Sequence, residues 1–111
     1  MAPNRDEIPP GTLEMLILTT LTRHKEMHGF EIASSIQEVS GDVLQVEEGS
    51  LYPALQRMLI KGWLVAEWGR TQENRRARYY RVTPEGRKQL TEEIEGYRRV
   101  QGAIGRILRL A

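Results

Sequence analysis

The amino-acid sequence predicts a mainly α-helical fold with one small β-hairpin, which places it in the α+β class. Apolar residues recur at helical spacing in four segments, and two alternating segments flank a polar loop near residues 69–74. A length of 111 residues suits a single domain. Hydrophobic content of 40% and charged content of 28% are ordinary for a globular protein, so we expect one modest core.

Composition excludes several classes of protein. The chain has no cysteine, which excludes disulfides and thiolate zinc sites, and it has no phosphate-binding glycine motif or nucleophile motif of an enzyme. His24 and His28 have the spacing of metal ligands on one helix, but His28-Gly29 resembles a helix start. We therefore expect no enzyme, metal or cofactor. No apolar run approaches the ~18 residues of a membrane span and no signal peptide is evident, so we expect a cytoplasmic protein.

The N-terminal part predicts a tail and a first helix. Residues 1–10 carry three prolines among charges, which indicates a disordered tail or a short arm. Gly11-Thr12 then opens a helix from about Leu13 to His24. Its apolar residues occupy more than one side, and so small a chain has little core to cover them all. We therefore expect Leu13, Met15 and Leu18 to contribute to a subunit contact.

A second helix is predicted at Gly29–Val39, after a polar link at Lys25–His28. Its apolar residues, which should point toward the core, are Phe30, Ile32, Ala33 and Ile36. A turn and a β-prone run at residues 43–46 follow. The second helix is close enough in sequence to the next one for a helix-turn-helix.

The stretch Glu47–Leu64 predicts a third helix. Gly49-Ser50 supplies its start, Pro53 fits within its first turn, and Gly62 follows its last turn. The apolar face comprises Leu51, Leu55, Met58 and Leu59. The opposite face carries hydrogen-bonding side chains without an acid, namely Ser50, Tyr52, Gln56, Arg57 and Lys61. Such a helix suits a DNA major groove, although an ordinary surface helix has the same pattern.

Residues 63–68 and 75–82 alternate around the polar loop and predict a β-hairpin. Although the net charge is +1, residues 1–68 hold five basic and ten acidic residues, whereas residues 69–88 hold seven basic and two acidic ones. Such a local basic patch suits phosphate contact, and a solvated hairpin without a partner is the alternative. A basic hairpin after a helix-turn-helix is the wing of a winged helix. Trp63 and Trp68 are interpreted as packing residues rather than base-stacking ones.

Thr83-Pro84-Glu85 is a strong start signal for a C-terminal helix that runs toward Leu110, about 40 Å if continuous. Its heptad seam consists of Leu90, Ile94, Tyr97, Gln101, Ile104 and Leu108. A seam longer than its own domain implies a partner, most simply the same helix in a second subunit. Three interior glycines reduce helix stability by about 1 kcal/mol each, which burial of the seam would outweigh.

Five short motifs resemble the PadR family of bacterial transcriptional regulators. They are Gly11-Thr12-Leu13, His28-Gly29-Phe30-Glu31-Ile32, Gly49-Ser50-Leu51-Tyr52-Pro53-Ala54-Leu55, Arg75-Arg76-Ala77-Arg78-Tyr79-Tyr80 and Thr83-Pro84-Glu85-Gly86. They occur in order over residues 11–90, and the third is the most specific. The implied organisation is a tail at 1–10, a winged helix-turn-helix DNA-binding domain at 11–83 and a single dimerisation helix at 84–111.

The resemblance implies a dimeric repressor of stress, detoxification or transport genes that binds a palindromic operator and is released by a small molecule. It implies that Ser50, Tyr52 and Pro53 lie at the groove. From the polar face of the same helix we expect Gln56, Arg57 and Lys61 to contact DNA as well. It also implies that Lys25, His28 and Gly29 approach phosphate, and that the wing contacts the backbone through Arg75, Arg76 and Arg78. We expect Asn74, beside these arginines, to belong to the same contact. The two recognition helices of the dimer should lie about 34 Å apart.

Two further points concern partners. Some relatives bind flat aromatic drugs between tryptophans of the C-terminal helices, and this chain has no tryptophan after Trp68. Tyr97 is then the aromatic residue available to an effector at the dimer interface, or it is plain interface. The competing function is a winged helix used for protein–protein contact, which predicts a neutral or apolar wing. RNA binding lacks an evident aromatic platform.

Overall fold

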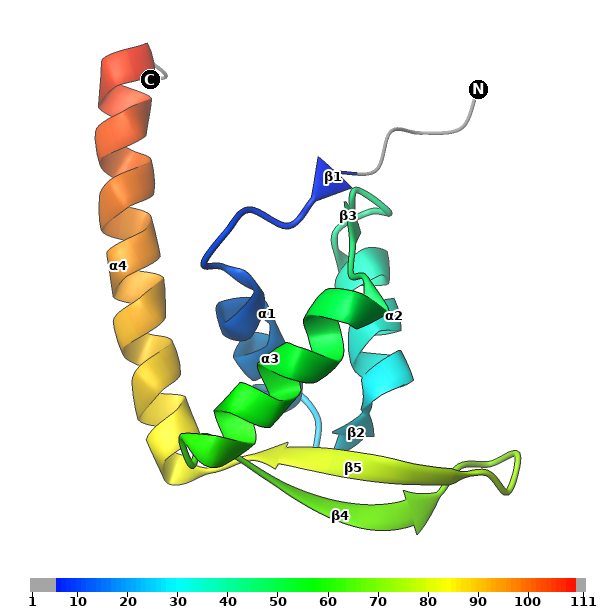
Figure 1. Ribbon diagram of the computed structural model, residues 1–111. Coiled ribbons are helices and arrows are strands. Elements are labelled where there is room, and N and C mark those ends of the chain that lie inside the picture. Colours follow the sequence, from blue (N-terminus) through cyan, green and yellow to red (C-terminus); the bar gives the residue numbers. More distant parts are fainter. Residues whose placement is uncertain (1–5, 110–111) are drawn as a thin grey trace, which may run out of the picture.

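The computed structural model describes residues 6–109 and has the α+β architecture that the sequence predicts (Figure 1). The elements in chain order are β1 (Asp6–Glu7), α1 (Leu13–Thr22), β2 (Met27–His28), α2 (Gly29–Val39), β3 (Leu44–Gln45), α3 (Glu48–Ile60), β4 (Leu64–Arg70), β5 (Arg76–Val82) and α4 (Pro84–Leu108). Helices α1 to α3 form a bundle, β4 and β5 extend from it as a wing, and α4 rises beside it. The fold is a winged helix-turn-helix with a long C-terminal helix.

Helix α1 lies at the centre of the core and contacts α2, α3, α4 and β5. Ile17 and Leu18 of α1 have no exposed surface at all, and Leu21 is 1% exposed. The prediction that Met15 and Leu18 contact a second subunit is therefore wrong, because the chain's own elements already cover both side chains. The sequence alone does not show that this short helix is enclosed by four neighbours.

The strands form two sheets, of which one is the wing. Strands β4 and β5 pair antiparallel from Leu64 opposite Val82 to Arg70 opposite Arg76, and β2 pairs with the outer edge of β5. Strand β1 pairs parallel with β3, so Asp6–Glu7 form an ordered arm along residues 44–45, and residues 1–5 of the predicted tail lie outside the described residues. The predicted polar link at Lys25–His28 contains strand β2. Strands β1 and β2 are not expected, because two residues are too few to produce a periodicity in the sequence.

Helix α2 has the predicted bounds and an unusual N-cap. The His28 ring nitrogen Nδ1 accepts a hydrogen bond from the Glu31 backbone N–H at 3.4 Å, and Glu31 Oε1 accepts one from the His28 N–H at 3.0 Å. This reciprocal capping box explains the sharp start at Gly29. Ile32 and Ile36 are buried as predicted, whereas Phe30 is 72% exposed, so the expectation that Phe30 faces the core is wrong.

The start of α4 is fastened to the end of α3. Thr83 is the N-cap residue of α4: its hydroxyl oxygen accepts from the Gly86 N–H at 3.0 Å, and the hydroxyl donates to the Gly62 carbonyl at 2.7 Å. The Thr83 N–H also donates to the Trp63 carbonyl at 3.0 Å. Gly86 packs so closely on the Trp63 backbone that an added Cβ would lie 2.3 Å from the Trp63 carbonyl oxygen. We call this junction of residues 62–63 and 83–86 the joint.

Helix α4 is continuous through its three interior glycines and projects past the bundle. The radius of gyration is 15.3 Å, above the roughly 13 Å of a compact chain of this length. Leu90 is buried against the bundle and Ile94 is half-buried on it, so Leu90 is a core residue of its own chain rather than a free dimer contact. Among residues 6–109, no helix is long and apolar enough to span a membrane.

Replacement of Gly86 by alanine tests the joint. Because the new methyl group would overlap a backbone carbonyl, we expect Gly86→Ala to lower the free energy of unfolding by about 3 kcal/mol, measured by urea denaturation at fixed protein concentration. Gly102→Ala is the matched control in the same helix, where the nearest atom is 3.6 Å away, and it should raise stability by about 1 kcal/mol. Equal effects of the two substitutions would contradict the close contact.

Candidate nucleic-acid interface

Helix α3 presents a polar face and buries an apolar one. Its buried residues are Leu51, Ala54, Leu55 and Met58, all at most 1% exposed. Its exposed residues include Ser50, Tyr52, Pro53 and Gln56. The N-cap residue is Glu47 rather than Gly49 or Ser50, and the helix begins at Glu48, so Pro53 lies in the second turn rather than the first. Pro53 has no N–H for the Gly49 carbonyl, which leaves that carbonyl without its usual helical donor.

Arg57 and Lys61, at the C-terminal end of α3, are directed toward α1. Arg57 Nε lies 3.2 Å from Glu14 Oε1, and Lys61 Nζ lies 3.9 Å from Glu14 Oε2. Lys61 also sits over the Trp63 ring, 4.5 Å from its centroid. These exposed ion pairs contribute little stability, but they place both cations apart from the N-terminal half of α3.

The N-terminal half of α3 meets the start of α2 through Tyr52. An added Cβ on Gly29 would lie 2.8 Å from the Tyr52 hydroxyl oxygen and 2.9 Å from Cε1, so the ring covers the first turn of α2 closely. Tyr52 remains 47% exposed. Lys25 and His28 flank the same turn, Lys25 exposed and His28 half-buried. The structure therefore brings together Lys25, His28, Gly29 and Tyr52, which the sequence predicts for one interface, at a positive helix end.

The wing is joined to this region through Tyr80. Tyr80 is 6% exposed, and burial raises the pKa of its phenol, an effect that the nearby Arg78 guanidinium only partly opposes. Tyr52 also lies close enough to affect this pKa. The Tyr80 hydroxyl is therefore neutral at physiological pH. In the sheet Tyr80 lies opposite Met27 of β2, directly before the start of α2.

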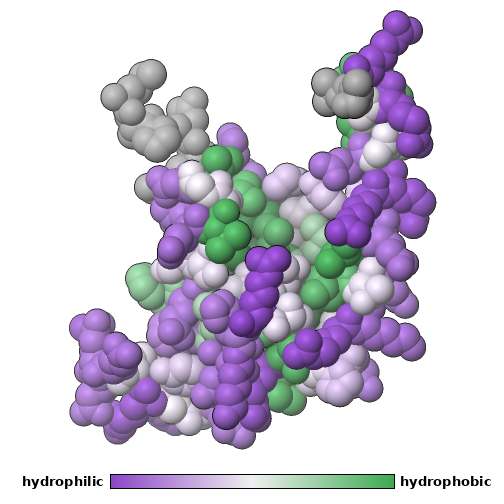
Figure 2. Space-filling view, turned by 180° about the vertical axis from the view of Figure 1, so that it is seen from behind, coloured by the Kyte–Doolittle hydropathy of each residue, from purple (hydrophilic) through white to green (hydrophobic). Residues whose placement is uncertain are grey.

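The tip of the wing is shaped by Asn74, which has a positive φ of 61° that asparagine tolerates well. Arg70 Nη1 donates to the Asn74 carbonyl at 3.2 Å, and the Arg75 N–H donates to the Thr71 hydroxyl at 3.2 Å. Arg75 is 82% exposed and only loosely paired with Glu73 at 4.0 Å. In the view of Figure 2 the end of the wing, at lower left, is a hydrophilic surface.

The alternation of strand residues separates the wing arginines onto two faces. Arg81 pairs with Glu67 at 3.3 Å on one face. Arg76 and Arg78 lie on the other face and stack on Trp68, with guanidinium carbons 4.2 and 5.9 Å from the ring centroid. Trp68 is 59% exposed, so it packs on the strand but outside the core. It is not among the interface residues that the sequence predicts, because its position directly opposite Arg78 is visible only in the structure.

A second exposed surface lies on the free part of α4. Tyr97, Ile104 and Leu108 of the predicted seam are 44%, 51% and 61% exposed, and Gln101 is exposed too. Val100 and Ile107, which lie beside the seam, are 57% and 80% exposed. Leu13, the residue of α1 that is also predicted for the subunit contact, is half-buried in its own chain. The apolar character of α4 therefore persists after it leaves the bundle, which an isolated helix in water would not favour.

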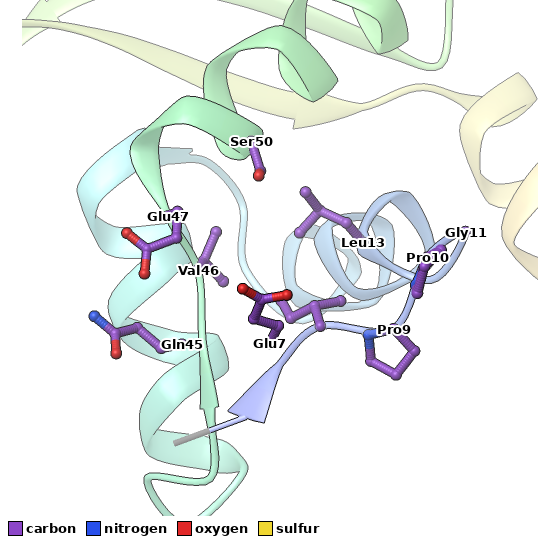
Figure 3. A pocket seen from close by; sticks show the side chains of 10 residues that line it. Glu7, Pro9, Pro10, Gly11, Leu13, Gln45, Val46, Glu47 and Ser50 are labelled. Carbon is purple, nitrogen blue, oxygen red and sulfur yellow. The ribbon is translucent and has the colours of Figure 1, made fainter. Parts of the chain in front are cut away.

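A small cavity of about 290 Å³ lies between the N-terminal arm and the start of α3 (Figure 3). Ile8, Leu13 and Val46 form its apolar part, and Glu7, Glu47 and Ser50 its polar part.

Among the described residues no group of three or more His, Asp or Glu side chains is arranged to hold a metal ion. His24 and His28 lie on either side of the turn into β2 rather than on one helix.

Comparisons with known proteins agree on one family. The family model for the transcriptional regulator PadR-like family matches residues 17–92. An uncharacterized protein of Lysinibacillus sphaericus is 30% identical over 100 residues, which cover 90% of this chain and 91% of that protein. Transcriptional regulator Rv3488 of Mycobacterium tuberculosis is 44% identical over 68 residues, 61% of this chain and 60% of that one.

Solved structures show the same fold. A transcriptional regulator from Clostridium thermocellum matches with a TM-score of 0.79 and 27% identity, covering 86% of this chain and 92% of that one. A PadR family regulator from Eggerthella lenta matches with a TM-score of 0.75 and 28% identity, covering 91% and 85%. Bacillus subtilis PadR, solved in complex with operator DNA, has the same fold, with a TM-score of 0.66 and 23% identity over 78% of this chain and 48% of that one.

The contact between Tyr52 and α2 can be tested by a double-mutant cycle. Gly29→Ala should lower the free energy of unfolding by about 1 kcal/mol, because the half-exposed Tyr52 ring must swing away. In a Tyr52→Ala background the same change should no longer be unfavourable, since the atoms that it meets are gone. Urea denaturation of the four proteins measures this coupling, and strictly additive effects would show that the two residues do not touch.

Proposed function

We propose that this chain, which belongs to the PadR-like family of transcriptional regulators, acts as a dimer that binds an operator in DNA and controls transcription. The observation that supports this most is the juxtaposition of the exposed half of α3, the first turn of α2 and the arginine-rich wing around Tyr52 and Tyr80. Bacillus subtilis PadR, with the same fold, is a protein that binds operator DNA. The family consists of regulators rather than enzymes.

In this proposal each part of the interface has its own role. Ser50, Tyr52, Pro53 and Gln56 of α3 enter the major groove, where hydroxyl and amide groups reach base edges. Lys25, His28 and Gly29 meet a phosphate at the N-terminus of α2, where backbone N–H groups and the helix dipole favour an anion. Asn74, Arg75, Arg76 and Arg78 hold the wing on the backbone. Arg57 and Lys61 have a smaller part, because both are directed toward the Glu14 carboxylate of α1.

The dimer in this proposal forms through α4. The seam residues beyond the bundle are exposed in one chain, and a second copy of α4 would bury them with the heptad spacing intact. Residues 11–83 are then the DNA-binding unit and residues 84–111 the dimerisation helix. Two such chains related by a twofold axis present two recognition helices to half-sites about 34 Å apart, or a multiple of that distance.

The regulatory outcome follows from the resemblance to the family. We propose repression, because a dimer on an operator excludes RNA polymerase from the same DNA, in the cytoplasm where the bacterial chromosome lies. The regulated genes would serve stress response, detoxification or transport, and a small molecule at the dimer interface would release the DNA. Tyr97, half-exposed on α4, is the aromatic side chain that such an effector would meet.

The DNA-binding role predicts a specific salt dependence. We expect the protein to bind duplex DNA from upstream of its own gene more tightly than scrambled DNA in fluorescence anisotropy titrations at near-physiological salt. Arg75→Ala combined with Arg76→Ala should weaken binding to both duplexes. It should also reduce the slope of log affinity against log salt by about 3 to 4 for a dimer, because four phosphate contacts are lost.

Arg81→Ala is the control for the wing variant, since Arg81 pairs with Glu67 on the opposite face and should leave the slope nearly unchanged. An unaltered slope in the double variant would contradict phosphate contact by Arg75 and Arg76. Failure of the unmodified protein to bind either duplex would favour the protein-interaction function of a winged helix.

The dimer prediction concerns the exposed end of the seam. Ile104→Asp combined with Leu108→Asp should yield monomers in analytical ultracentrifugation and weaken operator binding by more than tenfold, because two charges would face the partner helix. Ile94 is less suitable, since it also packs on its own bundle. Val39→Asp, at a position 72% exposed on α2, is the control and should remain dimeric. A dimer that persists in the Ile104/Leu108 variant would exclude this interface.

A further inference from the structure

The wing exposes one large aromatic side chain, Trp68, in otherwise hydrophilic surroundings. The ring is 59% exposed, whereas Leu64 on the same strand face is buried at 2%. A tryptophan this far from the core buries too little surface to be explained by hydrophobic packing. Its contacts within the wing therefore need another explanation.

Those contacts are with two arginines of the facing strand. Trp68 lies directly opposite Arg78, and Arg76 is two residues before Arg78 on β5. All three side chains therefore share one face of the hairpin. The Arg76 guanidinium carbon is 4.2 Å from the ring centroid and that of Arg78 is 5.9 Å away. Both distances are within the range of a cation–π interaction.

The two stacked arginines differ from the other wing arginines in the groups that their side chains contact. Arg75 faces Glu73 at 4.0 Å, Arg81 faces Glu67 at 3.3 Å, and Arg70 is used in closing the tip of the wing. Within residues 6–109, Arg76 and Arg78 have no carboxylate partner. An arginine on an aromatic face keeps its in-plane N–H groups available, and these are the groups that bind phosphate.

The face that carries this cluster continues into the core on the helix side of the wing. Leu64 and Tyr80 lie on the same face, closer to the base of the hairpin, and both are buried against the bundle. Arg78 reaches from the Trp68 ring to the neighbourhood of the Tyr80 hydroxyl, which is also close to Tyr52. The stacked arginines are therefore held on the face of the wing that is turned toward the helical bundle at its base.

We propose that Trp68 is a positioning residue, which holds Arg76 and Arg78 in the orientation in which they contact DNA phosphates. A free arginine side chain loses considerable rotamer freedom when it binds, and prior stacking on Trp68 removes part of that loss before DNA arrives. Trp68 acts through the two arginines and not by stacking on a base. This inference rests on the proposed DNA-binding function and assigns to Trp68 a role in it.

The experiment compares ring-preserving and ring-removing substitutions. Trp68→Leu should weaken DNA binding about tenfold for a dimer with two wings and reduce the salt slope, measured by anisotropy across a salt series. Trp68→Phe keeps an aromatic face and should restore most of the affinity. Since Trp68 is exposed, both variants should have the unfolding midpoint of the unmodified protein, and Val65→Ala on the opposite face is the control for a change within β4.

A double-mutant cycle with Arg76→Gln shows whether Trp68 acts through the arginine. If it does, Trp68→Leu should cause less than half of its usual loss of affinity in the Arg76→Gln background. Additive losses would overturn the proposal and indicate direct contact of Trp68 with DNA. Unchanged affinity of Trp68→Leu, with the unmodified protein still bound, would overturn it while leaving the proposed function intact. Absence of DNA binding by the unmodified protein would remove both.

Discussion

The arrangement of this protein depends on the close approach of two backbone segments at the joint. The end of α3, the base of the wing and the start of α4 all meet where Gly62 and Trp63 accept hydrogen bonds from Thr83. Gly86 allows α4 to lie against the Trp63 carbonyl, an approach that any side chain would prevent. Because no linker separates the wing from α4, the direction of the long helix is set by the same contacts that hold the wing in place. The proposed surface for DNA and the proposed surface for a second subunit are thus joined directly through these contacts.

The electrostatics of the chain are equally local. The net charge of +1 is the sum of an acidic N-terminal part and a basic wing. In the structure the cations also differ in the groups that surround them. Arg57, Lys61 and Arg81 have carboxylates within 4 Å, whereas Arg76 and Arg78 have an aromatic ring. Arginines of the same chain therefore differ in how readily they can exchange their carboxylate or aromatic partner for a phosphate.

Much of the fold could be predicted from the sequence because its signals are local. The capping residue Thr83, the alternation of the wing and the stripe of α3 each act within a few residues, and the elements occur where these patterns place them. Other features depend on tertiary contacts and leave no local signal. Leu18 has the appearance of an interface residue until α1 is found at the centre of the bundle, and the pairing of β1 with β3 joins segments nearly forty residues apart. The role proposed for Trp68 depends on cross-strand register, which alternation alone does not fix.

In the proposed dimer the length of α4 has a consequence for the spacing of the two DNA contacts. Its 25 residues extend about 37 Å from the joint, so a rotation of about 10° at either end displaces the other by roughly 6 Å. Base pairs are stacked about 3.4 Å apart along the duplex, so this displacement amounts to nearly two of them. In a dimer held by α4, a modest change in the crossing angle of the two helices would move the recognition helices out of phase with their half-sites without any change in the winged unit itself. A small rotation of α4 would then be enough to separate the recognition helices from the base pairs that they contact.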